Sequence, residues 1–139
     1  MTIDELEGRA LAQSVARACG MVQDLKHPRW WDCGPDCPDE GHGWCIDSDA
    51  PVYSGGVLLT YRPDINIAQA WELVEWITAK ERRADFYLSR EDDGRWSVVI
   101  HDLRWCHEDN YYKVTVDVYG ESTAPVAICR AFLKAKAAR

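Results

Sequence analysis

The chain has 139 residues, of which 47% are hydrophobic and 28% are charged, and its formal net charge is −7. A chain of this length and composition can bury a core as one domain, which excludes a disordered polypeptide. The acidic balance disfavours nonspecific nucleic-acid binding, because displacing counterions from phosphates requires a basic surface. No apolar run reaches the roughly 18 residues of a membrane span, and "MTIDELEGRALAQ" lacks the apolar segment of a secretory signal, so we expect a cytosolic protein.

The first predicted element is a helix from about Ile3 to Cys19. Thr2 and Glu5 have the spacing of a capping box, and Gly20 is placed to end the helix in the left-handed conformation. One apolar stripe recurs at helical spacing: Leu6, Ala10, Leu11, Val15 and Ala18.

No period survives in residues 23–54, where four prolines and several glycines break any regular element. An irregular insert of this length usually carries a function or a cross-link. The sequence "GVLLTY", Gly56–Tyr61, predicts a short strand that returns the chain to the body of the domain.

A second helix is predicted from about Ile65 to Arg82, with Asp64 as its N-cap. Its expected inward face consists of Ile67, Ala70, Trp71, Val74 and Ile77. Three tryptophans on regular elements are expected in the core or at its margin: Trp71, Trp76 and Trp96.

Three antiparallel strands are predicted next, at Asp85–Arg90, 95–103 and 111–120, with a turn at Asp92–Gly94 joining the first two. In the third strand, Tyr112, Val114, Val116 and Val118 alternate with polar residues, which is typical of a strand with one buried face.

The last predicted helix is "APVAICRAFLKAKAAR", capped by Thr123 and with Pro125 in its first turn. Its inward stripe is Ile128, Ala131, Phe132 and Ala135. The order helix, insert, helix, three strands, helix predicts one α+β domain over residues 1–139, folded as a three-layer α/β/α sandwich with helices on both faces of an antiparallel sheet.

Three stretches together show a family pattern: "TIDELEGRALAQSVA", "DINIAQAWELVEWI" and "STAPVAICRAFLKA". With them the chain resembles the phage ABA sandwich domain, a family of small proteins of tailed bacteriophages and prophages. The resemblance implies an α/β/α fold and a protein that works in the cytoplasm of an infected bacterial host. The family has no established catalytic motif, so the resemblance assigns no role to any residue.

The insert contains the pattern C-x3-C-x4-H-x2-C. Four nitrogen or sulfur donors in one loop are typical of structural Zn²⁺ sites, and bound metal would offset the ordering entropy of the insert. The predicted ligands are Cys33, Cys37, His42 and Cys45. Two alternatives stay open: these are unligated loop thiols, or ligands are recruited from His27, Cys106 or His107.

Three tryptophans flank this pattern: Trp30, Trp31 and Trp44. On a loop they would stack on a planar ligand such as a nucleobase or anchor a protein interface, and the alternative is that they pack the insert onto the domain. Four arginines are candidate partners for a phosphate: Arg62, Arg82, Arg83 and Arg90.

The insert is also acidic, with Asp32, Asp36, Asp39, Glu40, Asp47 and Asp49. These residues would either dock on a basic host protein or only form a solvated surface. Enzyme motifs such as G-x-S-x-G, the P-loop and H-E-x-x-H are missing, and Cys106 and His107 are neighbours that point apart on an extended loop.

We therefore expect a non-enzymatic accessory protein that captures a nucleotide-type immune signal of the host, in a pocket between subunits of a homo-oligomer. Two alternatives stay open. One is a zinc-stabilised interaction module that docks the acidic insert on a host protein, and the other is an enzyme that uses Cys106 or His107.

Overall fold

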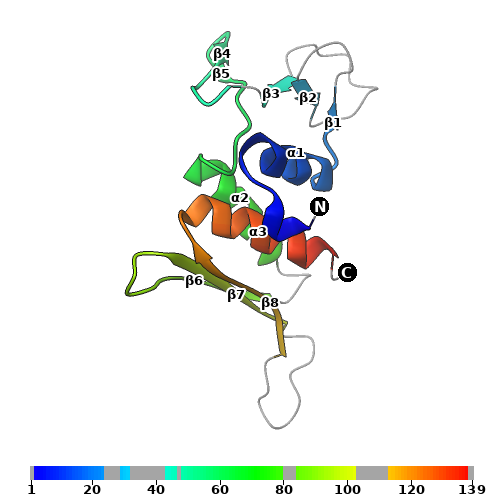
Figure 1. The fold of residues 1–139 in the computed structure, drawn as a ribbon. Helices are drawn as coiled ribbons and strands as arrows, with labels where there is room; N and C mark the ends of the chain where they lie inside the picture. Colours follow the sequence, from blue (N-terminus) through cyan, green and yellow to red (C-terminus); the bar gives the residue numbers. More distant parts are fainter. Residues whose placement is uncertain are drawn as a thin grey trace.

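The computed structural model describes residues 2–23, 29–31, 43–46, 48–79, 84–102 and 113–137. In Figure 1 the helices of the described part of the chain lie between two groups of strands. In chain order the elements are η1 (Ile3–Glu5), α1 (Gly8–Ala18), β1 (Val22–Gln23), β2 (Arg29–Trp31), β3 (Gly43–Cys45), β4 (Tyr53–Ser54), β5 (Val57–Leu58), α2 (Ile67–Ile77), β6 (Ala84–Arg90), β7 (Trp96–Asp102), β8 (Lys113–Glu121) and α3 (Ala124–Ala137).

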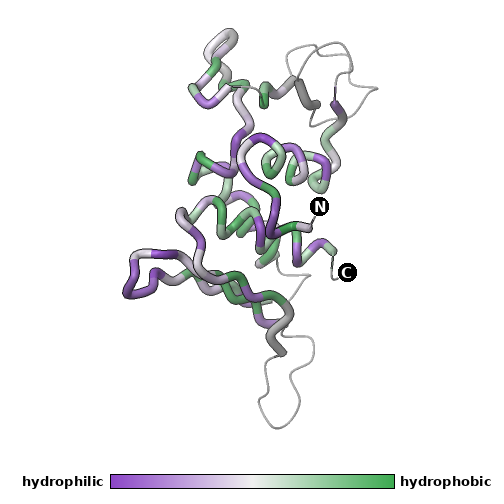
Figure 2. The backbone as a smooth tube through the Cα atoms, viewed as in Figure 1, coloured by the Kyte–Doolittle hydropathy of each residue, from purple (hydrophilic) through white to green (hydrophobic). Residues whose placement is uncertain are grey.

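The largest sheet is the antiparallel meander β6-β7-β8, as the alternation in the sequence predicts. Ala84 pairs with Asp102 at one end of the β6–β7 hairpin and Arg90 with Trp96 at the other. Gly94 takes a φ of +83° in the predicted turn, where its N–H donates to the carbonyl of Glu91. This turn is strongly hydrophilic (Figure 2).

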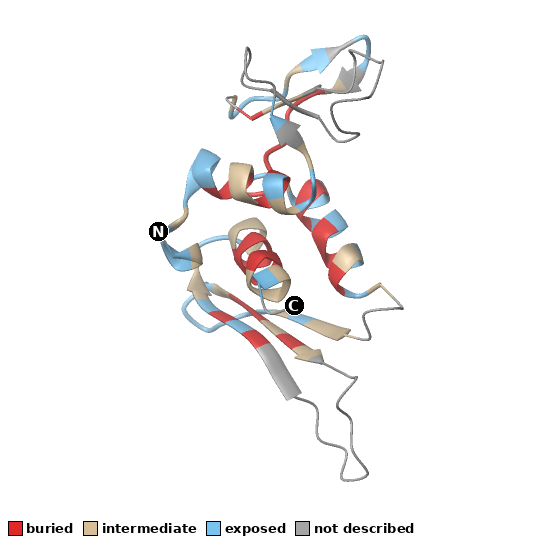
Figure 3. Cartoon of the chain, turned by 90° about the vertical axis from the view of Figure 1, so that its right-hand side faces the viewer, coloured by how far each residue is buried: buried red, intermediate tan, exposed pale blue. Residues whose placement is uncertain are grey.

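All three helices lie on one side of this sheet in both views (Figures 1 and 3). α3 packs on β7 and β8, α2 contacts β6, and α1 packs on α3 away from the sheet. The α+β class is therefore confirmed, whereas helices on both faces are not what the described residues show. Tyr87 and Tyr119, on the other face of the sheet, are 51% and 61% exposed.

α3 is the central element of the hydrophobic core. Its residues from Ala127 to Leu133 are all buried, because the sheet covers one side of the helix and α1 and α2 cover the other. Figure 3 shows the buried residues gathered where the helices and the sheet face one another. The predicted inward positions Ile128, Ala131 and Phe132 are confirmed.

α1 begins at Gly8, so the predicted start at Ile3 was wrong. Residues Ile3–Glu5 form a separate 3₁₀ turn, in which Glu5 accepts a hydrogen bond from the N–H of Thr2. Leu6 is extended, and its carbonyl accepts from Arg130 Nη2 at 2.9 Å instead of continuing a helix. The predicted end is confirmed, with Gly20 at a φ of +83°.

α2 is shorter than predicted and has a different cap. Asn66, whose side chain accepts from Gln69 N at 3.1 Å, caps the helix. The predicted cap Asp64 is buried and binds Arg62 instead. The predicted inward face was wrong at two positions, since Ile67 and Trp71 are 52% and 48% exposed.

The predicted insert 23–54 is not devoid of regular structure. β2 pairs with both β1 and β3, and Trp30 and Trp44 are Cα partners in that register. β3 also contacts the chain after β5, because Tyr61 N donates to the carbonyl of Cys45 at 3.0 Å and Cys45 N donates to that of Leu59. Ile46 is fully buried in the core, which fixes this end of the insert on the helices.

Candidate functional site

A cavity of about 310 Å³ lies where β3 meets the helices. The end of α1, β3, the segment after β5, α2 and α3 each contribute to its wall. Its lining, which we call the aromatic cavity, consists of Cys19, Met21, Trp44, Tyr61, Glu72, Leu73, Trp76, Phe132 and Lys136. Four of these nine side chains are aromatic, and the cavity presents ring surfaces from four separate parts of the chain.

Trp44 connects the insert to this cavity. Its ring lies 5.5 Å from that of Tyr61, at a tilt of 59°. The indole Nε1 of Trp44 is buried and has no hydrogen-bond acceptor among the described residues. A buried donor without an acceptor costs about 1–3 kcal/mol, so the arrangement favours a bound group that accepts a hydrogen bond.

Two ionisable side chains in the aromatic cavity stay protonated at neutral pH. The thiol of Cys19 lies 3.9 Å from Tyr61 Oη. Burial is the main cause that raises the pKa of Cys19 and also that of Tyr61 above their ordinary values. These groups therefore act as weak donors or acceptors toward a ligand and are poor nucleophiles or bases.

One cation and one acid complete the lining. Lys136 Nζ lies 4.5 Å from the ring centroid of Trp76, a cation–π distance. Trp76 also packs edge-on against Phe132, with 5.2 Å between the ring centroids. Glu72 is exposed on α2. The lining thus combines flat apolar walls with one positive charge, a composition suited to an aromatic ligand that carries an anionic group.

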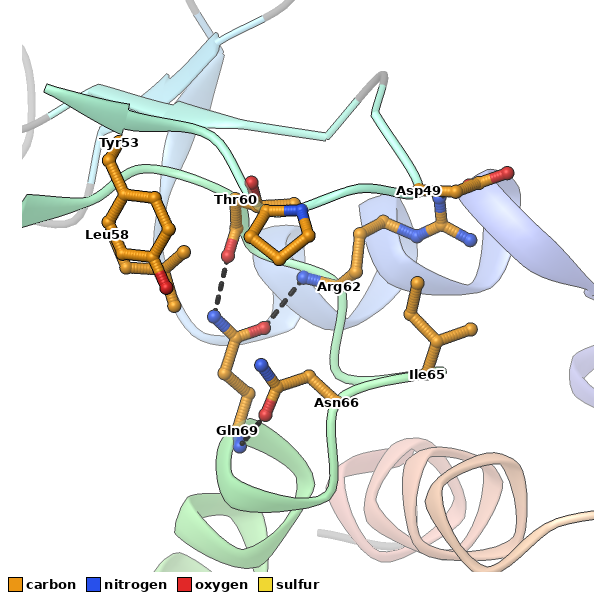
Figure 4. Close-up of a pocket in the computed structure, with 9 residues that line it drawn as sticks. Asp49, Tyr53, Leu58, Thr60, Arg62, Ile65, Asn66 and Gln69 are labelled. Carbon is orange, nitrogen blue, oxygen red and sulfur yellow. Dashed lines mark hydrogen bonds and ion pairs between the residues drawn. The ribbon is translucent and has the colours of Figure 1, made fainter.

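A second cavity, of about 200 Å³, lies at the start of α2 (Figure 4). We call it the Asp49 cavity, and it shares no lining residue with the first. Gln69 spans it, accepting from Arg62 N at 2.7 Å and donating to the carbonyl of Thr60 at 2.6 Å. Its lining consists of Asp49, Pro51, Tyr53, Leu58, Thr60, Arg62, Ile65, Asn66 and Gln69.

Arg62, a predicted phosphate partner, is 4% exposed in this second cavity. Its Nε and Nη2 donate to Asp64 at 2.8 and 2.7 Å, and its Nη1 binds Asp49. These contacts, that with Asp64 first, raise the pKa of Arg62 further above its ordinary value. Two carboxylates surround one cation here, so an incoming phosphate would have to displace Asp49.

The predicted ligand-binding residues are only partly brought together. Trp44 lines the aromatic cavity, whereas Arg62 lines the other one. Arg90 is exposed at the far end of β6, where it donates to the carbonyl of Gly94 and lies 5.8 Å from the ring of Trp96. The side chains of Trp30 and Trp31 and all of Arg82 and Arg83 lie outside what the structure describes.

The predicted zinc site falls largely outside the described residues. Cys33, Cys37 and His42 are not described, and neither are Cys106 and His107. Cys45 is described and partly buried in β3. Within the described ranges no three His, Cys, Asp or Glu side chains are grouped closely enough to hold a metal ion. The four-ligand site therefore stays a prediction.

Sequence reasoning missed most of the aromatic cavity. Phe132 and Lys136 are one turn apart on α3, but Trp44 and Tyr61 come from distant parts of the chain, and no spacing in the sequence links them to α3. The available signal was weak: Trp76 and Phe132 were expected in the core, and a core aromatic can also line a cavity. Lys136 lies in the last turn of α3, where a positive charge also suits the helix dipole, so its position alone does not indicate a cavity.

None of the helices in the described part of the chain has the length and apolarity needed to cross a membrane. Comparisons of the chain with models of protein families, with curated proteins and with solved structures find no match. The resemblance to the phage ABA sandwich domain thus stays a prediction.

Proposed function

We propose that this protein binds a small ligand with one planar aromatic ring, of the nucleotide type, in the aromatic cavity, and that it acts without catalysis. The observation that carries the proposal is the buried Nε1 of Trp44, a donor without an acceptor among the described residues, in a cavity walled by four aromatic rings. Ring nitrogens and carbonyl oxygens of a nucleobase are acceptors of the kind that Trp44 lacks.

The volume of the aromatic cavity and its positive charge limit the kinds of ligand that fit. The volume of about 310 Å³ is at the lower end of the range of roughly 300–1,000 Å³ for small-molecule sites, which suits one base and not two. The Nζ atom of Lys136 supplies a positive charge 4.5 Å from the ring centroid of Trp76. A nucleoside monophosphate meets both conditions, with its base between the rings and its phosphate at Lys136.

The absence of catalysis is part of the proposal. Cys19 and Tyr61 are candidate nucleophiles of this cavity, and the raised pKa of each disfavours the thiolate and the phenolate. The lack of the G-x-S-x-G, P-loop and H-E-x-x-H motifs in the sequence also favours a binding protein. Together with the resemblance to phage proteins, this supports an accessory factor that sequesters a nucleotide-type immune signal in the cytoplasm of an infected host.

The proposal is tested by calorimetric titration of the protein with a panel of nucleoside monophosphates, with Trp44→Phe and Lys136→Met as variants. Phenylalanine keeps a ring but removes the N–H, so we expect affinity for the preferred nucleotide to fall by up to about tenfold. Lys136→Met keeps the methylene stem and is expected to weaken binding several-fold and to reduce its dependence on salt.

The matched control is Trp71→Phe, because Trp71 is a tryptophan on α2 that does not line the aromatic cavity. Its affinity should equal that of the wild type. Failure of every nucleoside monophosphate in the panel to bind, or an equal loss in Trp44→Phe and Trp71→Phe, would refute the proposal.

A further inference from the structure

The outward side of α2 exposes large apolar residues that its periodicity predicts for the core. Ile67 and Trp71 are one helical turn apart and are 52% and 48% exposed, and Ile65 just before the helix is 51% exposed. Tyr53, 64% exposed, stands with Ile65 in the wall of the Asp49 cavity (Figure 4). We call these four residues the α2 face.

Among the residues that the structure describes, the exposed charges of α2 and of the Asp49 cavity are negative. Glu72 and Glu75 are exposed on α2, and α2 contains no lysine or arginine. Asp49, whose side chain is 74% exposed, stands at the cavity. The nearby cation, Arg62, is buried and held by two carboxylates, so it contributes no positive charge to the surface.

We propose that the α2 face and the Asp49 cavity dock a cationic amphipathic segment of a partner protein. Apolar side chains of the partner cover Ile67 and Trp71, and one lysine or arginine enters the Asp49 cavity beside Tyr53 to reach the carboxylate of Asp49. Trp71 is the anchor, because exposed tryptophans carry much of the binding energy in interfaces of this kind. The single sign of charge selects a basic partner over a second copy of this acidic chain.

The hydrogen bonds of the Asp49 cavity agree with a cationic occupant. Both atoms of the Gln69 amide are hydrogen-bonded, since its Oε1 accepts from Arg62 N and its Nε2 donates to the carbonyl of Thr60. The Nε, Nη1 and Nη2 atoms of Arg62 donate to Asp64 and Asp49. The guanidinium of Arg62 is thus already bound to carboxylates, whereas the exposed carboxylate of Asp49 has lone pairs left for an ammonium or guanidinium group.

The test uses the full chain and a labelled 14-residue helical peptide made of leucine and lysine at amphipathic spacing, followed by fluorescence anisotropy. We expect the peptide to bind, its leucine and glutamate counterpart not to bind, and Trp71→Ala to weaken binding by about tenfold or more. Asp49→Asn should weaken it several-fold and reduce its salt dependence. Tyr119→Ala, which removes an exposed aromatic from the sheet, is the matched control and should bind as the wild type does.

Several outcomes would overturn the proposal. A basic peptide attracted only by the net charge of −7 would bind without any contribution from Trp71. An unchanged affinity in Trp71→Ala is therefore one outcome that overturns the proposal. Equal binding of the glutamate peptide is another, and a third is a dimer in sedimentation that Trp71→Ala dissociates, since that result assigns the α2 face to a second copy. Trp44→Phe should leave peptide binding intact, which separates this surface from the nucleotide proposal.

Discussion

The pair of Asp64 and Arg62 is expected to hold the chain before α2 in place, and Asp64→Asn tests this. Both side chains are nearly inaccessible, at 2% and 5% exposure, and two charge-assisted hydrogen bonds of 2.7 and 2.8 Å join them. Asparagine keeps the shape but leaves a buried guanidinium with only Asp49 as its charged partner. Breaking one side of a buried pair costs about 3–5 kcal/mol, a large part of the 5–15 kcal/mol that typically stabilises a domain.

Asp49→Asn is the matched comparison, because Asp49 binds the same arginine with a side chain that is 74% exposed. An exposed partner contributes about 1 kcal/mol or less. Urea denaturation followed by circular dichroism should therefore show Asp64→Asn about 3 kcal/mol less stable than the wild type and Asp49→Asn within about 1 kcal/mol of it, at equal m-values. Equal losses of stability in the two variants, or no loss in Asp64→Asn, would show that burial of the Asp64–Arg62 pair does not set its contribution.

Three further predictions concern pH, the N-terminal anchor and metal. Burial raises the pKa of Cys129 and of Tyr61 above their ordinary values of 9.0 and 10.0, so the unfolded chain loses these protons first. Stability should therefore fall by about 1.4 kcal/mol per pH unit for each group, above about pH 9 for Cys129 and above about pH 10 for Tyr61. Urea midpoints at pH 7, 9 and 10 in reductant check this, and a flat profile contradicts it. Arg130→Met leaves the carbonyl of Leu6 and the carboxylate of Glu121 without their partner and should cost about 3–5 kcal/mol by the same assay, whereas a loss below 1 kcal/mol would show that the pair contributes little. If the predicted four-ligand site holds Zn²⁺, elemental analysis should find about one zinc per chain, less in Cys45→Ser, and a content under about 0.2 would exclude it.

Periodicity located the regular elements well where one face of an element is buried. The alternation at Val116 and Val118 and the stripe at Ile128 and Phe132 predicted buried positions correctly, because each element there packs on one side or at the centre of the core. The same reasoning failed for α2, where Ile67 and Trp71 follow the helical period yet are about half exposed, with Trp71 at the margin of the core against Phe86 of β6. A pattern shows that residues share a face, but it does not show what that face meets.

The candidate site was predicted less well than the fold. Trp44 was selected for its place in the insert, and the structure does put it against Tyr61. Arg62 was selected for its charge alone, and a sequence does not reveal that Asp64, two residues later, folds back on it. Tyr61, Trp76 and Lys136 are brought together only by tertiary packing, so no local pattern could have identified the aromatic cavity.

The most direct test of the aromatic cavity follows the indole N–H resonance of Trp44 in a nitrogen–proton correlation spectrum during titration with nucleoside monophosphates. The account predicts that this resonance, assigned by its loss in Trp44→Phe, moves downfield and saturates as a ligand supplies the missing acceptor, while that of Trp71 stays in place. If the Trp44 resonance does not move at saturating nucleotide, or moves no more than that of Trp71, then no nucleotide accepts a hydrogen bond from Trp44 in the aromatic cavity.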